Sequence, residues 1–339
     1  MSDAIRNICD HLVERSSTLF LGAGINAGIR NSEDERCPLG QDLSEWICRD
    51  LLGSPETKVA LDDAVEMARY KLGPKPVNDY IYEKLETFEP GAAHLALVQL
   101  PWDVIYTTNF DLLVEKGATS PAIQAAGSVR TVLTSSASLA SFSESDILYY
   151  KLHGTVDLAN TADGRLILTK SDYRFYEEYK RPLFRRLRTD LLSRNFLFVG
   201  YGLSDPNFRA ILEDCREELG VQTFPLSYAI QHDFSSVQEA FWRDKYNIQL
   251  LRADATEFLV ALKDTWFAEG CEVVPFLQRR ALEYLNLDPS TRFQKVGDSF
   301  YLLRPVDCVG PSNPSAFFRG AEPSWGRHTR ESSPSQRCV

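Results

Sequence analysis

The stretch Thr18–Asn26 constrains the fold of this chain more than any other. Its first residues, Thr18–Leu21, are uncharged and mostly bulky, and they run directly into Gly22-Ala23-Gly24. This pattern is typical of a buried strand that ends in a tight turn. Because glycine has no Cβ, the backbone at Gly22 and Gly24 can adopt positive φ and let a phosphate group approach the amides. A helix beginning after Ile25 would direct its free N–H groups at the same anion. The same pattern also occurs in ordinary strand-to-helix turns. The motifs further along the chain are therefore needed to distinguish a phosphate-binding turn from an ordinary one.

The composition is that of a soluble globular protein. The chain has 339 residues, 44% hydrophobic and 25% charged, which allows one large α/β domain or two domains. The sequence shows no apolar run of membrane-spanning length and no signal-peptide pattern, so we expect a cytoplasmic protein that binds no membrane. Seven cysteines without a C-x-x-C pair predict neither a disulfide framework nor a zinc site. The net charge of −10 disfavours sequence-specific nucleic-acid binding, and the basic run 180–188 is expected to be a solvated helix face.

Strand and helix patterns alternate along most of the chain. A helical period covers 3–15, and a series of helical patterns predicts a helical insert over about 40–100. The strand-like runs are Thr18–Leu21, 102–108, 129–133, 147–152, 166–168, 196–199, 226–230 and 248–251. Helical stretches follow at 173–192, 206–219 and 255–267. This alternation predicts an α/β fold whose mostly parallel sheet carries helices on both faces.

Polar or glycine-rich clusters follow four of the predicted strands. Besides Gly22–Asn26, they are Asn109–Asp111, His153-Gly154 and Gly200–Asp205. In parallel sheets ligands bind beyond the carboxyl ends of the strands, where the strand order reverses. Four such clusters at one edge of a sheet therefore predict a binding site there.

Three side chains in these clusters are candidates for chemistry or binding. His153, one of five histidines, stands at a strand end before a glycine, where a neutral imidazole can take a proton from a hydroxyl group or from water. Asn109 and Asp111 also have an ordinary interpretation as turn formers or helix caps. Gly200 and Gly202 would let backbone amides approach a ribose, and no metal-binding motif is present.

Taken together, four motifs resemble those of the sirtuin-like domain, in the branch found in bacterial antiphage defence proteins. They are Gly22-Ala23-Gly24-Ile25-Asn26, Thr107–Asp111, Lys151–Gly154 and Val199–Phe208, and the resemblance covers about residues 1–265. It implies a Rossmann-like fold with NAD bound across the edge of the sheet. By position, Asn109 would place the attacking water, Asp111 would hold the nicotinamide end and His153 would be the base. The expected NAD-binding residues are Gly22, Ala23, Gly24, Asn26, Thr108, Asp111, Gly200, Gly202, Ser204 and Asp205.

Two departures from that family shape the expected reaction. The zinc ribbon of deacetylating sirtuins is missing, and Asn26 stands where sirtuins usually carry serine. Without the ribbon, water rather than an acylated lysine is expected to attack the ribose, so that NAD is a substrate and is cleaved to nicotinamide and ADP-ribose. No metal is expected. The alternatives are a sirtuin-type deacylase, an ADP-ribosyltransferase, and a module that senses NAD or ADP-ribose without turnover.

The resemblance also carries expectations about biology and domain organisation. It implies an effector that depletes NAD in antiphage defence and is gated by oligomerisation or by a sensor partner, such as an Argonaute-type, helicase-like or fused NTPase module. We expect an NAD-binding domain over 1–268 and a C-terminal extension over 269–339, which begins an appended module. From about residue 311 the composition turns to Pro, Ser, Gly and Arg, which predicts a flexible tail.

Overall fold

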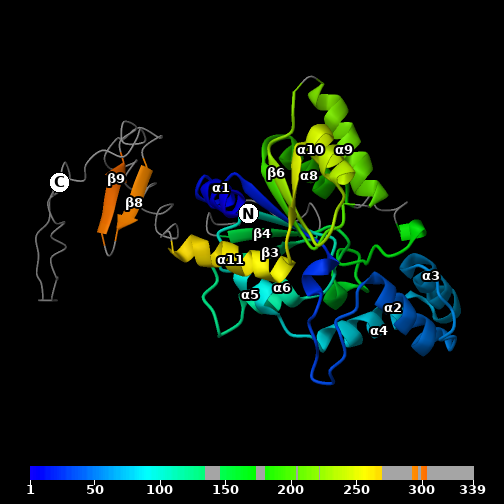
Figure 1. The fold of residues 1–339 in the computed structure, drawn as a ribbon. Helices are drawn as coiled ribbons and strands as arrows, with labels where there is room; N and C mark the ends of the chain where they lie inside the picture. Colours follow the sequence, from blue (N-terminus) through cyan, green and yellow to red (C-terminus); the bar gives the residue numbers. More distant parts are fainter. Residues whose placement is uncertain are drawn as a thin grey trace, which may run out of the picture.

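A parallel sheet of seven strands forms the centre of the protein in the computed structural model (Figure 1). The structure describes residues 1–133, 146–172, 180–203, 205–220, 222–268, 292–296 and 299–303. The strands are β1 Ser17–Leu21, β2 Val104–Thr107, β3 Ser128–Val132, β4 Asp146–Lys151, β5 Asn195–Val199, β6 Ser227–Gln231 and β7 Ile248–Arg252. Their order is β3-β4-β2-β1-β5-β6-β7, and every neighbouring pair is parallel. The predicted α/β fold is confirmed.

Helices cover both faces of this sheet, and side-chain alternation along the strands explains why. Leu19 and Leu21 of β1 belong to the core under α1, α5 and α11, whereas Phe20 belongs to the core under α8, α9 and α10. Because both faces are covered, β1 is buried along its whole length, and its sequence carries no charged residue. The helices concerned are α1 Ser2–Val13, α5 Ala92–Leu97, α6 Leu113–Ala118, α8 Arg181–Ser193, α9 Pro206–Leu219, α10 Ser236–Tyr246 and α11 Ala255–Ala268.

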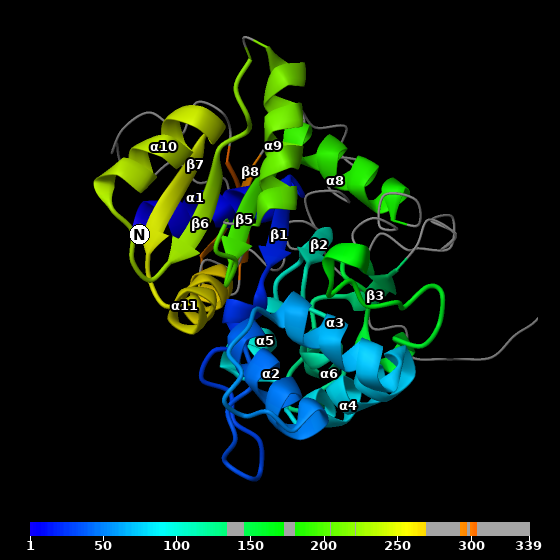
Figure 2. The ribbon, with the colours of Figure 1, turned by 90° about the vertical axis from the view of Figure 1, so that its right-hand side faces the viewer.

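Three further helices form a separate core with the loop that follows β4. They are α2 Gly40–Ile47, α3 Leu61–Leu72 and α4 Pro74–Glu86, and Figure 2 shows them grouped beyond the end of the sheet toward which β1 points. Leu166 and Leu168 of the loop are buried in this core. The helix α5, which the sequence pattern grouped with the insert, packs instead against α11 and the sheet.

Several local predictions differ from the structure. The run 166–168 is not a strand, because its apolar side chains are buried against the insert helices without pairing with the sheet. Helix α10, which the sequence analysis missed, begins with a capping box between Ser235 and Gln238. The strands β8 Arg292–Val296 and β9 Ser299–Leu303 form an antiparallel pair. Residues 173–179 of the helix predicted at 173–192 and the tail expected from 311 lie outside the described residues.

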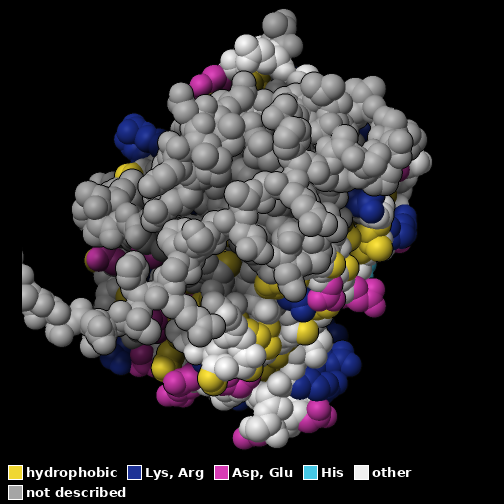
Figure 3. Space-filling model, turned by 90° about the vertical axis from the view of Figure 1, so that its left-hand side faces the viewer, with side chains coloured by type: hydrophobic (Ala, Val, Ile, Leu, Met, Phe, Trp, Pro, Cys, Tyr) yellow, Lys and Arg dark blue, Asp and Glu magenta, His cyan; other side chains and the backbone are white. Residues whose placement is uncertain are grey.

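The charged groups of the described surface are largely mixed in sign. In the basic run, Arg186 pairs with Asp190, Arg188 pairs with Glu218 on α9, and Lys180 is buried. Figure 3 shows hydrophobic, acidic and basic side chains next to one another on the described part of the face that it presents. No helix in the described part of the chain is long and apolar enough to cross a membrane.

Candidate functional site at the carboxyl edge of the sheet

The four clusters predicted from the sequence follow four neighbouring strands. The strands β4, β2, β1 and β5 lie side by side, so the segments that begin at Leu152, Thr108, Gly22 and Gly200 meet at one edge. The order reverses at β1, because the chain continues from β1 to β2 on one side and later reaches β5 on the other. This reversal is where open α/β sheets bind ligands.

The glycine turn after β1 is packed against the backbone that follows β5. The Gly22 N–H donates to the carbonyl of Val199 at 3.0 Å, and the Gly24 N–H donates to the carbonyl of Gly200 at 2.9 Å. A Cβ on Gly22 would lie 2.5 Å from the Gly200 oxygen. Gly200 itself has a φ of +65°, and a Cβ there would lie 2.2 Å from the Ile25 nitrogen. Three glycines are therefore required for two chain segments to touch.

This geometry corrects two expectations about the turn. The φ of Gly22 is −121° and Gly24 also avoids positive φ, so the predicted positive φ values are wrong, and close approach explains both glycines instead. No α-helix follows Ile25: the segment Ala23–Asn26 (η1) is a single 3-10 turn, and the next helix is α2. The exposed Ala23 begins that turn, where a backbone N–H has no acceptor within the turn.

Asn109 is buried against the glycine turn with a fixed orientation. Its side chain is 7% exposed, and its Nδ2 donates to the carbonyl of Gly22 at 3.2 Å. Its own N–H donates to Thr107 Oγ1, and the Thr108 N–H donates to the carbonyl of Leu21. Since the carbonyl of Gly22 accepts only, the amide nitrogen must face it. Oδ1 is then the end of the amide that can accept a hydrogen bond from a ligand or water.

Asp111 and Asn26 are joined in the interior beside this turn. Asn26 Nδ2 donates to Asp111 Oδ2 at 2.8 Å, and Asp111 Oδ1 accepts the Leu113 N–H at 3.0 Å. Lys151, fully buried, donates to the carbonyl of Asp111, to Glu115 at 3.0 Å and to Thr155 at 3.0 Å. The structure thus places Asn26 against Asp111. It also places Lys151 beside Asp111, a contact that the motif Lys151–Gly154 alone did not predict.

His153 lies at the end of β4 in a half-buried position. Its carbonyl accepts the Ile167 N–H at 3.1 Å, and the following Gly154 has a φ of +84°. Burial lowers the pKa of His153 to about 4; the nearby Asp205 carboxylate raises it and the Lys180 cation lowers it. The imidazole is therefore neutral at pH 7, which is the form that can accept a proton.

The segment after β5 supplies backbone rather than charge. Gly202 is exposed, and Ser204 lies outside the described residues. Asp205 caps α9, accepting the Asn207 N–H at 2.8 Å, so its carboxylate already has a structural role.

Lys180, which directly precedes α8, is buried and donates to the carbonyls of Leu133 and Asp163. Burial lowers the pKa of Lys180 to about 8.

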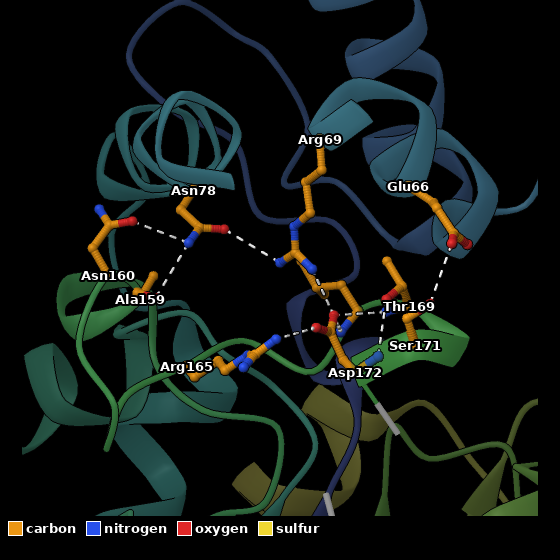
Figure 4. Close-up of polar contacts among 10 residues, drawn as sticks. Glu66, Arg69, Asn78, Ala159, Asn160, Arg165, Thr169, Ser171 and Asp172 are labelled. Atoms are coloured by element: carbon orange, nitrogen blue, oxygen red, sulfur yellow. Dashed lines mark hydrogen bonds and ion pairs between the residues drawn. The ribbon is translucent and has the colours of Figure 1, made fainter. Parts of the chain in front are cut away.

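A polar network fastens the loop behind His153 to the insert helices (Figure 4). Asp172 Oδ2 accepts Arg69 Nη1 at 2.7 Å and the N–H groups of Leu168 and Thr169. From α4, Asn78 donates to the carbonyl of Ala159 at 3.2 Å. Burial alone would raise the pKa of Asp172, but Arg69 and the backbone donors outweigh it and lower the pKa below its usual value. Arg69 and Asn78 therefore hold the loop that follows β4 and contains His153.

The described residues contain no group of three or more His, Cys, Asp or Glu side chains suited to a metal ion. The site as described therefore consists of an amide, a neutral imidazole, a buried carboxylate and a glycine turn.

Comparisons with known proteins point to one kind of domain. Residues 103–251 match the family model of the SIR2-like domain. The NAD(+) hydrolase ThsA of Enterococcus faecium is 26% identical over 265 residues, covering 73% of this chain and 51% of that protein. The NAD(+) hydrolase ThsA of Acinetobacter baumannii is 27% identical over 275 residues, covering 77% and 53%. The chain thus spans about half the length of the curated relatives that it matches.

Among solved structures, the crystal structure of a Sir2 homologue–NAD complex aligns with a TM-score of 0.42 at 13% identity. The alignment covers 77% of this chain and 93% of that one.

Proposed function

We propose that this chain, whose residues 103–251 match the family model of the SIR2-like domain, hydrolyses NAD to nicotinamide and ADP-ribose. The observation that carries the proposal is that Asn109, whose Oδ1 is directed away from its bond to Gly22, and the neutral His153 follow the neighbouring strands β2 and β4 at the same edge of the sheet. The names of the relatives support it, since they are NAD(+) hydrolases.

In this proposal each residue has one task. Asn109 Oδ1 accepts a hydrogen bond from the attacking water and orients it toward C1′ of the nicotinamide ribose. The oxygen of that water forms the new bond to C1′, while the electrons of the C1′–N bond leave with nicotinamide. His153 takes the proton that the water releases. Asp111 faces the nicotinamide end, and the exposed Ala23 amide meets the phosphates.

The proposal extends to biological role only through the resemblance of the motifs. We propose an NAD-depleting effector of antiphage defence, located in the cytoplasm and kept inactive until an oligomer or a protein partner switches it on. Ungated hydrolysis of NAD would harm the cell that makes the enzyme. The division into a domain at 1–268 and an extension at 269–339 belongs to the same proposal.

The direct test is the release of nicotinamide from NAD, measured by chromatography with the purified chain. Release at a rate proportional to protein concentration would support hydrolysis, and equimolar ADP-ribose would identify water as the acceptor. Bound NAD without release, both for the chain alone and across a concentration range that drives self-association, would favour a sensing module instead.

The pKa of His153 makes a prediction about pH. Its pKa in the folded chain is about 4, below the ordinary value of 6.5 for a histidine. Since only the neutral imidazole accepts a proton, kcat/KM should stay level from pH 8 to about 5 and fall about tenfold per pH unit below the folded pKa. Between pH 6.5 and 4 the unfolded chain binds more protons at this position, so the contribution of His153 to stability is lost as the pH falls. A break in the rate profile near pH 6.5 would show that this imidazole is not shielded from solvent.

A further inference from the structure

A chain of three buried polar side chains ends at the Asp111 carboxylate. His94 of α5 lies 3.1 Å from Asn26 Oδ1 through its Nε2, and Asn26 Nδ2 lies 2.8 Å from Asp111 Oδ2. The exposed fractions are 0% for His94, 4% for Asn26 and 5% for Asp111. All three side chains therefore make these contacts away from bulk water, where a hydrogen bond with a charged partner is strong.

The chemistry of the three groups fixes the direction of both hydrogen bonds. An ionised carboxylate accepts only, so Asn26 must turn its NH₂ group toward Asp111 and its oxygen toward His94. His94 must then carry its proton on Nε2. Burial lowers the pKa of His94, although Asp111 partly opposes this, so the ring is neutral. Its buried Nδ1 accepts no hydrogen bond from the described residues. The amide of Asn26 thus has one orientation.

Asn26 has little left to offer a ligand. Its oxygen and one amide hydrogen are used by His94 and Asp111. Cys37 also lies against this amide: burial raises the pKa of its thiol to about 12, and the hydrogen bond to Asn26 only partly opposes this, so the thiol stays neutral. That Asn26 binds NAD stays a prediction, whereas the side-chain contacts of Asn26 in the structure include those with His94 and Asp111.

We propose that Asn26 and His94 are positioning residues that orient the Asp111 carboxylate for the nicotinamide end of NAD. This inference rests on the proposed function. The Leu113 N–H holds Asp111 Oδ1, and Asn26 holds Oδ2, so the plane of the carboxylate is set by one backbone donor and one side-chain donor. Removing Asn26 leaves a buried oxygen without that donor and lets the carboxylate rotate about its remaining bond.

The test separates the two ends of NAD by comparing the affinity for NAD with that for ADP-ribose, which lacks nicotinamide. Affinities are measured by calorimetry in the Asn109→Ala background, so that NAD is not consumed. We expect Asn26→Ala and His94→Leu each to weaken NAD binding about tenfold, or about 1.4 kcal/mol. ADP-ribose should bind within about twofold of the parent, because its contacts do not involve Asp111.

Two further variants make the serial arrangement testable. His94→Gln places an amide N–H near the position of Nε2 and should bind NAD like the parent. The double variant Asn26→Ala/His94→Leu should be no weaker than Asn26→Ala, because His94 acts on Asp111 only through Asn26. If Asn26→Ala does not fold, Asn26→Ser, which keeps a small donor and acceptor, takes its place with a smaller expected loss of NAD affinity and the same unchanged affinity for ADP-ribose.

The outcomes distinguish this inference from the proposed reaction. Equal losses for NAD and ADP-ribose, additive losses in the double variant, or an NAD affinity unchanged by both Asn26→Ala and His94→Leu would overturn the positioning role. If the chain with Asn109 restored releases no nicotinamide while NAD affinity follows the expected pattern, the hydrolase proposal fails and the positioning role stands.

Discussion

Asn109→Ala and His153→Ala are each expected to lower nicotinamide release from NAD by about a hundredfold to ten-thousandfold while NAD still binds. Asn109 would lose the Oδ1 that orients water, and His153 would lose the neutral base whose pKa lies near 4. The fold should survive Asn109→Ala, because among the described residues the side chain of Asn109 hydrogen-bonds to the Gly22 carbonyl alone, at 3.2 Å. Chromatography of the products and calorimetry of NAD binding would measure the two effects separately.

Two control variants, one histidine and one asparagine outside the four clusters, test whether the loss of activity is specific to His153 and Asn109. His232 is 74% exposed and pairs only loosely with Asp254, at 3.7 Å, so His232→Ala removes an exposed histidine that belongs to none of the four clusters. Asn7 is partly buried on α1 and accepts the Tyr228 hydroxyl at 3.1 Å, so Asn7→Ala removes an asparagine with a single hydrogen bond. Both controls should retain wild-type turnover. Full activity in either site variant would remove that residue from the proposed mechanism.

Gly200→Ala is expected to destabilise the fold by more than about 3 kcal/mol and to abolish NAD binding. The new Cβ would lie 2.2 Å from the Ile25 nitrogen and 2.9 Å from the Gly22 oxygen, and both of these atoms are backbone. The glycine turn would have to move away from β5, carrying Ala23 with it. Chemical denaturation gives the free energy of unfolding, and calorimetry gives the affinity for NAD.

Gly53→Ala separates the two free-energy costs expected in Gly200→Ala, the left-handed backbone conformation of a non-glycine residue and the steric clash of the new Cβ. Gly53 has a φ of +71°, close to the +65° of Gly200, but a Cβ there meets nothing within 4 Å. Alanine at Gly53 therefore pays the conformational cost of a left-handed residue, about 1 kcal/mol, without a clash. The difference between the two variants measures the contact between the turn and β5. Equal losses in both would mean that this contact contributes no stability.

The sequence predicted that the four clusters of the candidate site meet at one edge of the sheet, but not the contacts among them. Apolar runs followed by glycine or polar residues mark strand ends locally, which is why Asn109 and His153 could be placed at one edge. The partners of Asn26 could not be predicted, because Asp111 and His94 lie 85 and 68 residues away in the chain. His94 stands on a short helix rather than at a strand end, so no strand-end pattern marks it in the sequence.

The same limitation explains the misjudged glycines and the false strand. Gly22 and Gly24 are needed because a distant segment touches them, whereas the sequence analysis considered only their own backbone. Leu166 and Leu168 are apolar because the insert helices cover them, and local periodicity does not distinguish burial under helices from burial in a sheet.

The ion pair between Arg69 and Asp172 has a consequence for how the molecule can be divided. Asp172 is buried, and the nearer of its two cations, Arg69, comes from a helix more than a hundred residues earlier in the chain. A deletion that removed the insert would leave this charge inside the protein with the more exposed Arg165, at 3.3 Å, but without Arg69, and the loss of the buried partner is costly. The insert therefore cannot be removed from the sheet without this cost. We expect that its helices and the loop after β4, which contains His153, can be exchanged between related proteins only together.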